Sequence, residues 1–385
     1  MRDTRALVLV TTSFPIRGDG SEAAGSFVSD LAEELAQHVP VRVVAPGSES
    51  IREKWAASVD VFRYASPEKP LSTLKPWKPQ DFFQMIRVLR AGTNATRCAV
   101  AAGPTAHILA LWVLPSGYWA RSAARSIGVP YSVWALGSDI WSLGRIPAIR
   151  SILKSVIRGA ADRYADGLQL GEDAARISGR PFAFLPSTRR LEGHRSRPLA
   201  SSPPYRLFFL GRWHPNKGID LLLDALALLG PNDWERIASV EICGGGPLES
   251  LVRAGVETLR AAGRPMELRG YLDKAAAADA ILRADYLLIP SRIESIPVIF
   301  SDAMKLDCPV VSMPTGDLSE LVANEPRCGV IASEISAPAF AAALSSALSQ
   351  APADFSTGMV ARAKQFDLGI AARRVLAGMG MNAHA

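Results

Sequence analysis

The sequence predicts an α/β protein with two Rossmann-like parallel-sheet domains that face each other across a cleft. Its 385 residues exceed what one ordinary hydrophobic core holds, so two domains of about 180 residues each are expected. Short apolar strand patterns alternate with helix patterns through both halves, which is typical of parallel sheets covered by helices. Polar or glycine-rich loops follow several of these strands, where open α/β sheets bind ligands.

The composition is that of a globular protein, with 48% hydrophobic and 21% charged residues. The longest apolar stretch, residues 98–114, contains Gly103, Pro104 and His107 and is a poor candidate for a membrane span. A net charge of +6 permits acidic partners such as diphosphates or anionic lipid headgroups. Nucleic acid is not expected as a partner, because no basic run with interleaved aromatic residues occurs.

The start of the chain and its cysteines indicate a cytoplasmic protein. Met1-Arg-Asp-Thr-Arg leads directly into the apolar run at 6–12, which predicts a strand and not a signal peptide. The four cysteines, Cys98, Cys243, Cys308 and Cys328, lie far apart without the spacing of a metal site, as in a reducing compartment. A peripheral position at the inner face of a membrane stays open as an addition to this prediction.

The first half carries the patterns of an N-terminal domain, expected over residues 1–195. Strands are expected at 6–12, 41–45, 107–113 and 131–136, and helices at 26–38, 80–100 and 117–127. A glycine-rich loop at 15–25 joins the first strand to the first helix. This loop is longer than the dinucleotide fingerprint and lacks its glycine spacing, so NAD is not expected.

A linker rich in Ser, Pro and Arg at 194–204 separates this half from a second one. The C-terminal domain is expected over 203–365, followed by a helical tail at 366–385. Its strands are expected at 205–210, 238–243, 266–269, 285–290, 308–313 and 327–331.

The segment 291–313 is the most informative part of the chain. Glu294 and Asp302 stand eight positions apart in a loop that runs into a helix, between apolar strand patterns at 286–290 and 309–313. This loop falls at the carboxyl end of a strand, where ligands bind. Both carboxylates are able to accept hydrogen bonds from hydroxyl groups.

The start of the following helix is suited to an anion. Pro297 fits the first turn of a helix, and the amides of Ile296 and Val298 would favour a group such as a diphosphate. Two carboxylates that seek hydroxyls beside a phosphate site are what a nucleotide-sugar requires.

A second constellation follows the strand at 205–210. Gly211 lets the backbone turn at the strand end, and Arg212 and Lys217 place two cations at the same edge as Glu294. There they would balance a diphosphate leaving group. The alternative is an ordinary strand-to-helix loop with solvated cations, and the carboxylate pair favours the functional interpretation.

Three weaker signals remain. Gly244 and Gly245 end another strand and permit close approach of a nucleotide, or form a plain tight turn. Asp139 either caps a turn or contacts a ligand. The pattern at 145–158 has cations along one helical repeat and indicates a surface helix with its apolar side in the core, with an interfacial helix as the alternative.

Together these pieces resemble the GT-B glycosyltransferases, specifically the retaining glycosyltransferase family 4 type, also described as glycosyl transferases group 1. The resemblance covers almost the whole chain. It rests on an ordered set of segments: 13–15 with the glycines that follow, 137–139, 211–218, 244–247, 284–285, 290–291 and the Glu294/Asp302 pair.

The resemblance implies transfer of a sugar from a nucleotide-diphosphate-sugar to an acceptor hydroxyl, with retention of the anomeric configuration. The acceptor would be a growing saccharide, a lipid-linked glycan or a cell-envelope glycan. Metal and other cofactors are not expected, because cationic side chains and helix amides offset the diphosphate charge.

The same resemblance assigns roles to individual residues. Glu294 would hold donor-sugar hydroxyls, and Asp302 the ribose hydroxyls. Arg212 and Lys217 would neutralise the diphosphate. The remaining donor contacts would come from Ile296, Pro297, Val298, Gly244, Gly245 and the backbone near Arg269, with Gly20, Leu136 and Asp139 contributed by the first domain.

Two positions depart from the family pattern. Asp302 stands where a second glutamate is usual, and Leu136 stands where a histidine usually contacts the donor sugar. Since leucine donates no hydrogen bond, the donor is either an unusual sugar or an ordinary hexose held by other groups. The rival functions are a non-catalytic homologue that binds nucleotide or glycan as a partner subunit, and another sugar-nucleotide enzyme such as an epimerase or phosphorylase.

Overall fold

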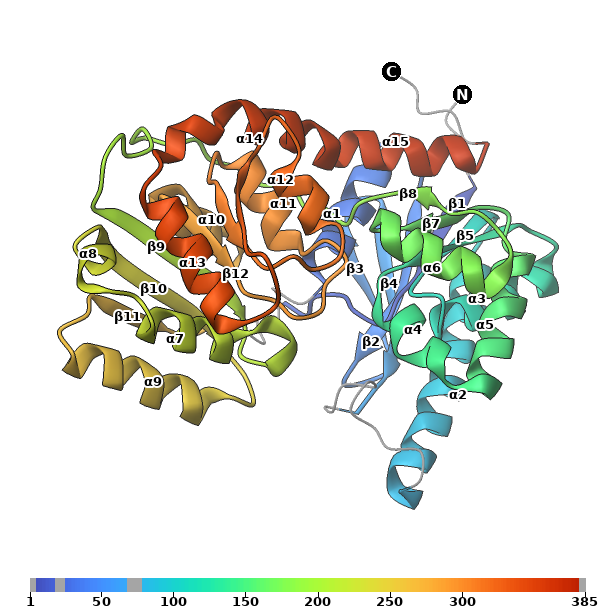
Figure 1. Ribbon diagram of the computed structural model, residues 1–385. Coiled ribbons are helices and arrows are strands. Elements are labelled where there is room, and N and C mark those ends of the chain that lie inside the picture. The colour runs from blue at the N-terminus through green and yellow to red at the C-terminus, as the bar shows by residue number, and fades with distance from the viewer. Residues whose placement is uncertain (1–4, 18–24, 68–77, 381–385) are drawn as a thin grey trace. The chain divides into compact units, whose positions relative to one another are not determined.

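The structure is a computed structural model that describes residues 5–17, 25–67 and 78–380. The chain forms two compact units, each built around a single sheet (Figure 1). Unit 1 comprises residues 1–189 and 368–385, and unit 2 comprises residues 190–367. Two parallel-sheet α/β units confirm the fold class that the sequence predicts.

The sheet of unit 1 has eight strands in the order β3-β4-β2-β1-β5-β6-β7-β8. All neighbouring strands pair in parallel except β3 and β4, which are antiparallel. The strands are β1 (Ala6–Val10), β2 (Val41–Gly47), β3 (Arg52–Ala56), β4 (Val59–Ala65), β5 (Thr105–Leu111), β6 (Tyr131–Ala135), β7 (Arg163–Ala165) and β8 (Ala183–Phe184).

The helices of unit 1 pack on both faces of this sheet. They are α1 (Ser26–Leu35), α2 (Pro79–Ala101), α3 (Ser116–Ile127), α4 (Ser138–Trp141), α5 (Pro147–Gly159), α6 (Leu168–Ser178) and α15 (Leu368–Gly378), with a 3-10 turn η2 (Leu143–Arg145). Because side chains alternate along a strand, β1 supplies Val8 and Val10 to one buried cluster and Leu7 and Leu9 to the other. Because these strands are buried on both faces, their residues are apolar at successive positions, which explains the continuous apolar runs in the sequence.

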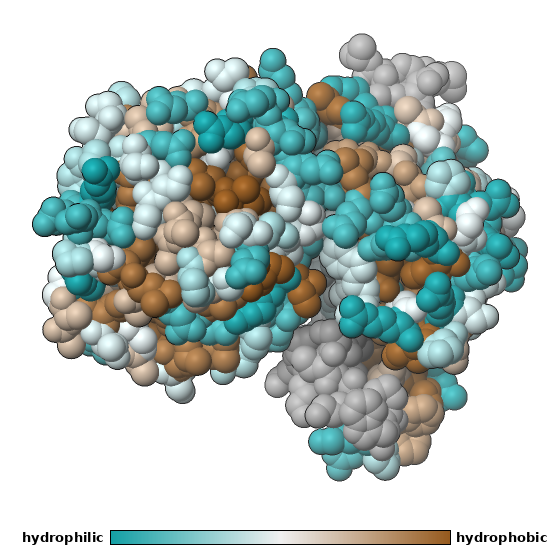
Figure 2. Space-filling view, in the orientation of Figure 1, coloured by the Kyte–Doolittle hydropathy of each residue, from teal (hydrophilic) through white to brown (hydrophobic). Residues whose placement is uncertain are grey.

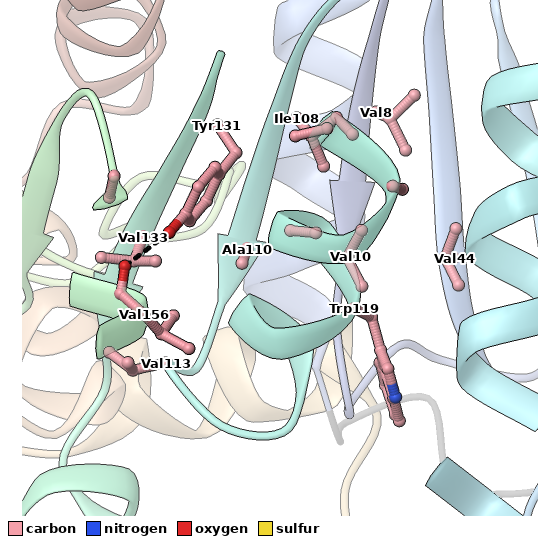
Figure 3. Close-up of a cluster of buried hydrophobic side chains, with 14 of the residues drawn as sticks. Val8, Val10, Val44, Ile108, Ala110, Val113, Trp119, Tyr131, Val133 and Val156 are labelled. Atoms are coloured by element: carbon pink, nitrogen blue, oxygen red, sulfur yellow. Dashed lines mark hydrogen bonds between the residues drawn. The ribbon is translucent and has the colours of Figure 1, made fainter. Parts of the chain in front are cut away.

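The first cluster joins the sheet to α2, α3, α5 and α6. Figure 3 shows its centre, where the Tyr131 hydroxyl donates a hydrogen bond of 2.6 Å to the Val156 carbonyl oxygen of α5. The second cluster joins the sheet to α1 and α15. The C-terminal helix α15, red in Figure 1, packs against α1 and buries Ala372 and Val375. It therefore belongs to the core of unit 1, although it follows all of unit 2 in the chain.

Unit 2 has six parallel strands in the order β11-β10-β9-β12-β13-β14. The strands are β9 (Tyr205–Arg212), β10 (Ile237–Gly245), β11 (Met266–Arg269), β12 (Tyr286–Ile289), β13 (Val310–Ser312) and β14 (Gly329–Ile331). The helices are α7 (Ile219–Ala227), α8 (Pro231–Trp234), α9 (Glu249–Ala261), α10 (Lys274–Arg283), α11 (Val298–Lys305), α12 (Leu318–Ala323), α13 (Ala337–Leu348) and α14 (Ser356–Ala363), with 3-10 turns η3 (Pro215–Lys217), η4 (Pro352–Phe355) and η5 (Lys364–Phe366).

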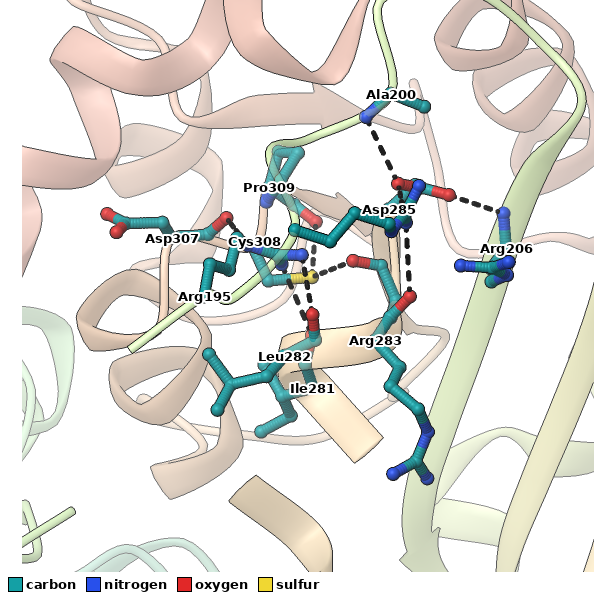
Figure 4. Close-up of polar contacts among 12 residues, drawn as sticks. Arg195, Ala200, Arg206, Ile281, Leu282, Arg283, Asp285, Asp307, Cys308 and Pro309 are labelled. Atoms are coloured by element: carbon teal, nitrogen blue, oxygen red, sulfur yellow. Dashed lines mark hydrogen bonds and ion pairs between the residues drawn. The ribbon is translucent and has the colours of Figure 1, made fainter. Parts of the chain in front are cut away.

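Residues of the expected linker at 194–204 form hydrogen bonds and an ion pair with the rest of unit 2 (Figure 4). Arg195 donates hydrogen bonds to the carbonyl oxygens of Leu282, at 2.8 Å, and Asp307, at 3.0 Å. The buried Asp285 carboxylate binds Arg197 at 2.8 Å and also accepts the amide of Arg206 at the start of β9. The division between the units accordingly falls after residue 189.

The sequence missed β3, β4, β7 and β8. β3 and β8 lie at the edges of the sheet, and β7 and β8 have only three and two residues. β4 is longer and mostly buried, but Asp60 and Arg63 interrupt its apolar residues, so none of the four shows the continuous apolar run that marks a central strand. The remaining strands appear where the sequence places them. None of the helices in the described ranges combines the length and apolar character that crossing a membrane requires.

Candidate active site

The sheet order of unit 2 reverses between β9 and β12, the place where open parallel sheets have their ligand-binding crevice. The chain proceeds from β9 to β10 and β11 on one side and from β12 to β13 and β14 on the other. Such a reversal is the topological switch point of an open parallel sheet, and ligands bind outside the carboxyl ends of the strands there. The two loops at this position are residues 211–218 and 290–297, which are the two constellations singled out in the sequence.

An ion pair joins these loops. The Lys217 ammonium, at the end of η3, contacts Oε1 of Glu294. The Ser291 hydroxyl lies 3.3 Å from the same oxygen. The Glu294 side chain is 14% exposed and that of Lys217 37% exposed. Because the carboxylate is largely shielded from water, its attraction to the ammonium is stronger than that of a surface pair.

A second ion pair fixes the geometry of the first. Arg292 donates two hydrogen bonds of 2.7 Å to the Asp220 carboxylate of α7 and a third of 2.7 Å to the Pro215 carbonyl oxygen. Burial acts to raise the pKa of the Asp220 carboxyl, but the hydrogen bonds and charge of Arg292 outweigh it and lower that pKa below its ordinary value. The Asn216 carbonyl oxygen also accepts the Arg292 amide at 2.8 Å. The two loops are thus held together by contacts other than the Lys217–Glu294 pair.

Two glycines allow the backbones at the pair to approach closely. Gly218 has a φ of +67°, and a Cβ atom there would lie 1.9 Å from the Pro290 carbonyl oxygen. Gly316, with a φ of +54°, would place a Cβ 2.3 Å from the Glu294 carbonyl oxygen. Any other residue at either position would displace the loop that carries Glu294.

The glycine cluster after β10 also serves close backbone packing. A Cβ on Gly244 would lie 2.0 Å from the Gly211 carbonyl oxygen. The Gly245 carbonyl oxygen accepts the Trp213 amide at 2.8 Å and the Tyr271 hydroxyl at 2.7 Å. The missing side chains therefore accommodate the chain's own β9 loop, and this contact explains the glycines without a nucleotide.

Arg212 and Arg269, the two other cations that the sequence assigns to the site, have different surroundings. Arg212 is exposed at the end of β9, in register with Gly245. Within the described ranges, its guanidinium has no ion pair. Arg269 pairs with Glu241 and Glu267, at 3.2 Å each, and the charge of Glu241 is the main reason why its pKa is raised.

Helix α11 begins directly after the second of these loops. Pro297 is its N-cap, Ile296 is buried just before it, and Val298 is its first residue. Asp302 lies one turn further on and is fully buried. In this structure the Asp302 carboxylate has no contact with solvent, which differs from an exposed ribose-binding group.

Unit 1 holds the other residues that the sequence singles out. Asp139 is fully buried and accepts the amides of Val113 at 2.6 Å, Ile140 at 3.1 Å and Leu136 at 3.3 Å. Burial raises the pKa of its carboxyl to about 6, against the opposing effect of these hydrogen bonds. Asp139 thus fastens the loops after β5 and β6. Gly20 lies outside the described residues.

Leu136 packs against the hydrophobic cluster of unit 1 that contains Trp134. It is intermediate in exposure, so a polar side chain at this position would disturb apolar contacts on one side.

The sequence missed the residues that position the pair. Arg292 and Asp220 are 72 positions apart, and no pattern links them. Gly316 could have been noted as a glycine shortly after β13, but its contact with Glu294 is visible only in the folded chain. No cluster of three or more His, Cys, Asp or Glu side chains in the described part of the chain is arranged to hold a metal ion.

Comparison with known proteins finds a family model that matches part of unit 2. Residues 204–350 match the family model described as Glycosyl transferases group 1. The D-inositol 3-phosphate glycosyltransferase of Jonesia denitrificans is 31% identical over 123 residues, which are 31% of this chain and 29% of that protein. The putative teichuronic acid biosynthesis glycosyltransferase TuaC of Bacillus subtilis is 28% identical over 229 residues. This match covers 56% of this chain and 54% of the relative.

The chain therefore spans less than a third of the first relative and about half of the second. Solved structures align over nearly its full length. Sucrose-phosphate synthase from Thermosynechococcus elongatus aligns with a TM-score of 0.72 at 18% identity, over 96% of this chain and 97% of that one. HepE of Anabaena in complex with UDP aligns with a TM-score of 0.67 at 13% identity, over 98% and 100% of the two chains. These alignments and the two parallel sheets establish the GT-B fold.

Proposed function

We propose that this GT-B protein is a retaining glycosyltransferase of family 4 type, which transfers a sugar from a nucleotide-diphosphate-sugar to an acceptor hydroxyl. One observation carries the proposal. The Lys217–Glu294 pair stands at the switch point of the sheet, inside the segment that matches the glycosyl transferases group 1 model. Solved structures of HepE that align with this chain hold UDP and UDP-glucose, which supports a nucleotide-sugar as the donor class.

The chemistry of the pair suits such a donor. A diphosphate arriving at the crevice carries negative charge that the Lys217 ammonium is able to neutralise, and the exposed Arg212 guanidinium offers a second cation. The charge on the diphosphate grows as the bond to the sugar breaks, so these cations stabilise the transition state more than the ground state. Glu294 is then released from Lys217 and accepts hydrogen bonds from the donor-sugar hydroxyls.

The amides around Ile296 and Val298, together with Pro297, line the same start of α11 and complete the anion site in this proposal. Gly244, Gly245 and Arg269 lie at the ends of the neighbouring strands β10 and β11. They would meet the nucleotide at the edge of the crevice.

Asp302 is assigned to the ribose hydroxyls. Because its carboxylate is buried in this structure, donor binding would have to expose it. Retention is proposed with a diphosphate oxygen as the proton acceptor, since the attacking hydroxyl then enters on the face that the leaving group vacates. No metal ion takes part in the proposed reaction.

A screen for cleavage of nucleotide-sugars tests the proposal. The wild-type protein is incubated with a panel of nucleotide-sugars, with and without hydroxyl acceptors, and release of nucleoside diphosphate is measured by mass spectrometry. Glu294→Gln should reduce release by about 100-fold or more. Glu325→Gln is the matched control, because the Glu325 side chain is 80% exposed on the surface, and it should leave the rate unchanged.

The same screen separates the rival functions. Release of nucleoside diphosphate supports a transferase, whereas conversion of one nucleotide-sugar into another without release identifies an epimerase. Binding without either reaction identifies a non-catalytic subunit. The anomeric configuration of the transferred sugar, measured by NMR, decides between retention and inversion.

The acceptor is proposed to be a growing saccharide, a lipid-linked glycan or a cell-envelope glycan, with a peripheral contact to an anionic membrane. Helix α5 supports the membrane contact. Leu153, Val156 and Ile157 are buried, which is the surface-helix arrangement expected from the sequence, yet Ile146 and Ile152 are 45% and 46% exposed. Sedimentation with anionic vesicles but not with zwitterionic vesicles would support the contact, and equal sedimentation with both would contradict it.

A further inference from the structure

A groove of about 880 Å³ lies in unit 1, between α2 and the β3–β4 edge of the sheet. Its described lining comes from the strand ends and loops on one side and from α2 on the other. This volume is in the range of about 300–1,000 Å³ typical of small-molecule sites.

One face of α2 forms a wall of the groove along much of the helix. Gln84, Val88, Ala91, Ala95 and Cys98 all line it, and their spacing of three and four residues places them on the same side of a helix. At 1.5 Å per residue, the groove follows α2 for about 21 Å. It is therefore long enough for an extended chain.

The charge of the lining is of one sign. Four arginines and no Asp or Glu side chain occur among the described lining residues. Two of the arginines are already paired, since Arg63 contacts Glu53 at 2.7 Å and Arg52 contacts Asp60 at 3.2 Å.

Arg87 and Arg90 differ from Arg52 and Arg63. Both are exposed, and in the described ranges neither has an ion pair. Their neighbours four positions away on α2 carry no charge, and the two guanidinium groups themselves are three positions apart, where like charges destabilise a helix. An anion placed between them would offset that repulsion and gain charge-assisted hydrogen bonds.

A buried polar atom also points to a ligand. Oε1 of Gln84 is buried without a hydrogen-bond partner in the described part of the chain. A buried amide oxygen left unsatisfied costs free energy, and a protonated phosphate oxygen of a bound molecule beside Arg87 would supply the donor.

The rest of the lining is apolar. Phe62 and Val88 are buried at the groove, and Ile51 is 50% exposed. Just before the groove, Phe82 and Phe83 are 47% and 65% exposed at the start of α2. Figure 2 shows hydrophobic and hydrophilic residues side by side over this end of α2, at the lower right of the view. The groove thus combines a cationic place for a headgroup with an apolar wall.

We propose that this groove binds an anionic amphiphile, an organic phosphate that carries an apolar chain. The phosphate lies between Arg87 and Arg90, and the chain follows Val88, Ala91 and Ala95 toward Cys98. That the bound molecule is the carrier of the sugar acceptor rests on the proposed glycosyltransferase function, whereas occupation of the groove does not.

The cysteines of the chain provide a direct test. Cys98 is exposed in the groove, whereas Cys243, Cys308 and Cys328 are buried. Burial raises the pKa of each of these three thiols to about 12, so they are unreactive near neutral pH. N-ethylmaleimide should therefore label Cys98 first, and the rate is measured by intact-protein and peptide mass spectrometry.

Three probes separate the parts of the proposal. Farnesyl diphosphate has both a charged headgroup and an apolar chain, inorganic pyrophosphate has the charge alone, and farnesol has the chain alone. At ten times its Kd, farnesyl diphosphate should slow labelling of Cys98 by about tenfold. Pyrophosphate and farnesol should slow it much less at the same concentration.

Variants of α2 assign the effect to the groove. The double variant Arg87→Gln/Arg90→Gln should raise the farnesyl diphosphate concentration for half-protection by at least about tenfold. Arg97→Gln is the matched control, because Arg97 is an exposed cation of the same helix outside the groove lining, and it should leave protection unchanged.

Three outcomes would overturn the proposal: no protection by farnesyl diphosphate, equal protection by farnesol, or equal protection by pyrophosphate. The last would identify a phosphate site without a chain. If farnesyl diphosphate protects Cys98 while no nucleotide-sugar is cleaved in the donor screen, the groove is a binding site and the glycosyltransferase function fails. If a donor is cleaved but farnesyl diphosphate does not protect Cys98, the glycosyltransferase function is supported and the proposed binding site in the groove fails.

Discussion

Lys217 and Glu294 are 77 positions apart in the chain, yet the ammonium of one contacts the carboxylate of the other. They belong to loops after β9 and β12, two strands that are neighbours in the sheet because the order reverses between them. In the absence of a donor, each group neutralises the other. In the proposed reaction, a diphosphate would compete for Lys217 and leave Glu294 available for the sugar, so the ion pair would hold both groups in place before the substrate arrives.

Replacing the cations should weaken turnover of the donor. Lys217→Gln and Arg212→Gln are each expected to reduce kcat/KM for the donor found in the screen by about 100-fold, because each removes a positive charge from the developing diphosphate. Lys364→Gln, an exposed lysine of η5, should have no effect. Steady-state kinetics measure the three variants, and unchanged kcat/KM in both site variants would contradict their assignment.

The Arg292–Asp220 pair should couple the two loops energetically. Both side chains are about 30% exposed, at 31% and 28%, and they share two hydrogen bonds. A double-mutant cycle with Arg292→Gln and Asp220→Asn is expected to give a coupling energy of about 1 kcal/mol in urea denaturation. Additive effects of the two substitutions would show that the pair does not stabilise the loops.

Gly218 should tolerate no side chain. A Cβ there overlaps the Pro290 carbonyl oxygen at 1.9 Å, whereas Gly263 has a similar φ of +74° with no atom near the added Cβ. Gly263→Ala should lower the free energy of unfolding by about 1–2 kcal/mol, the cost of the left-handed backbone. Gly218→Ala should cost at least about 1 kcal/mol more, because the overlap adds to that cost. Equal losses in urea denaturation would argue against the close contact.

Asp139 should make stability depend on pH. Its carboxyl is buried and its pKa is raised from 3.8 to about 6, so between these values the folded protein binds the proton more tightly than the unfolded chain does. The free energy of unfolding should therefore fall as pH rises from about 4 to 6, by about 3 kcal/mol from this group. Asp139→Asn removes this contribution, and the difference between wild type and variant should level off above pH 6. A difference that does not vary with pH would show that the pKa is not raised.

Leu136 should influence the choice of donor sugar. We expect Leu136→His to increase the rate with ordinary hexose donors relative to wild type, because imidazole supplies a hydrogen-bond donor that leucine lacks. Leu136→Gln serves as the control for lost apolar packing against the Trp134 cluster. The transfer rates of all three proteins are measured with a panel of nucleotide-sugar donors. If wild type and Leu136→His both strongly prefer the same ordinary hexose donor, the position does not select the sugar.

Much of the fold was predictable because the central strands are buried on both faces. Continuous apolar runs such as those of β1 and β12 are recognisable in the sequence, whereas the partly exposed edge strand β3 has no such run. The two loops of the candidate site were also predictable, since each carries charged residues directly after a strand. Their contact was only a hypothesis, because two strands separated by more than 70 residues are neighbours only if the sheet order reverses between them.

The sequence by itself determined the α/β class, the two sheets and the charged loops at the strand ends, because these depend on local apolar periodicity and on residues next to one another. The tertiary structure decided which partners those residues have. In the folded chain, Lys217 forms an ion pair with Glu294, and Gly244 packs against Gly211. The Asp139 carboxylate accepts hydrogen bonds from three backbone amides. The physical reason is that hydrogen bonds, ion pairs and steric contacts act over a few ångströms in space, whatever the separation along the chain.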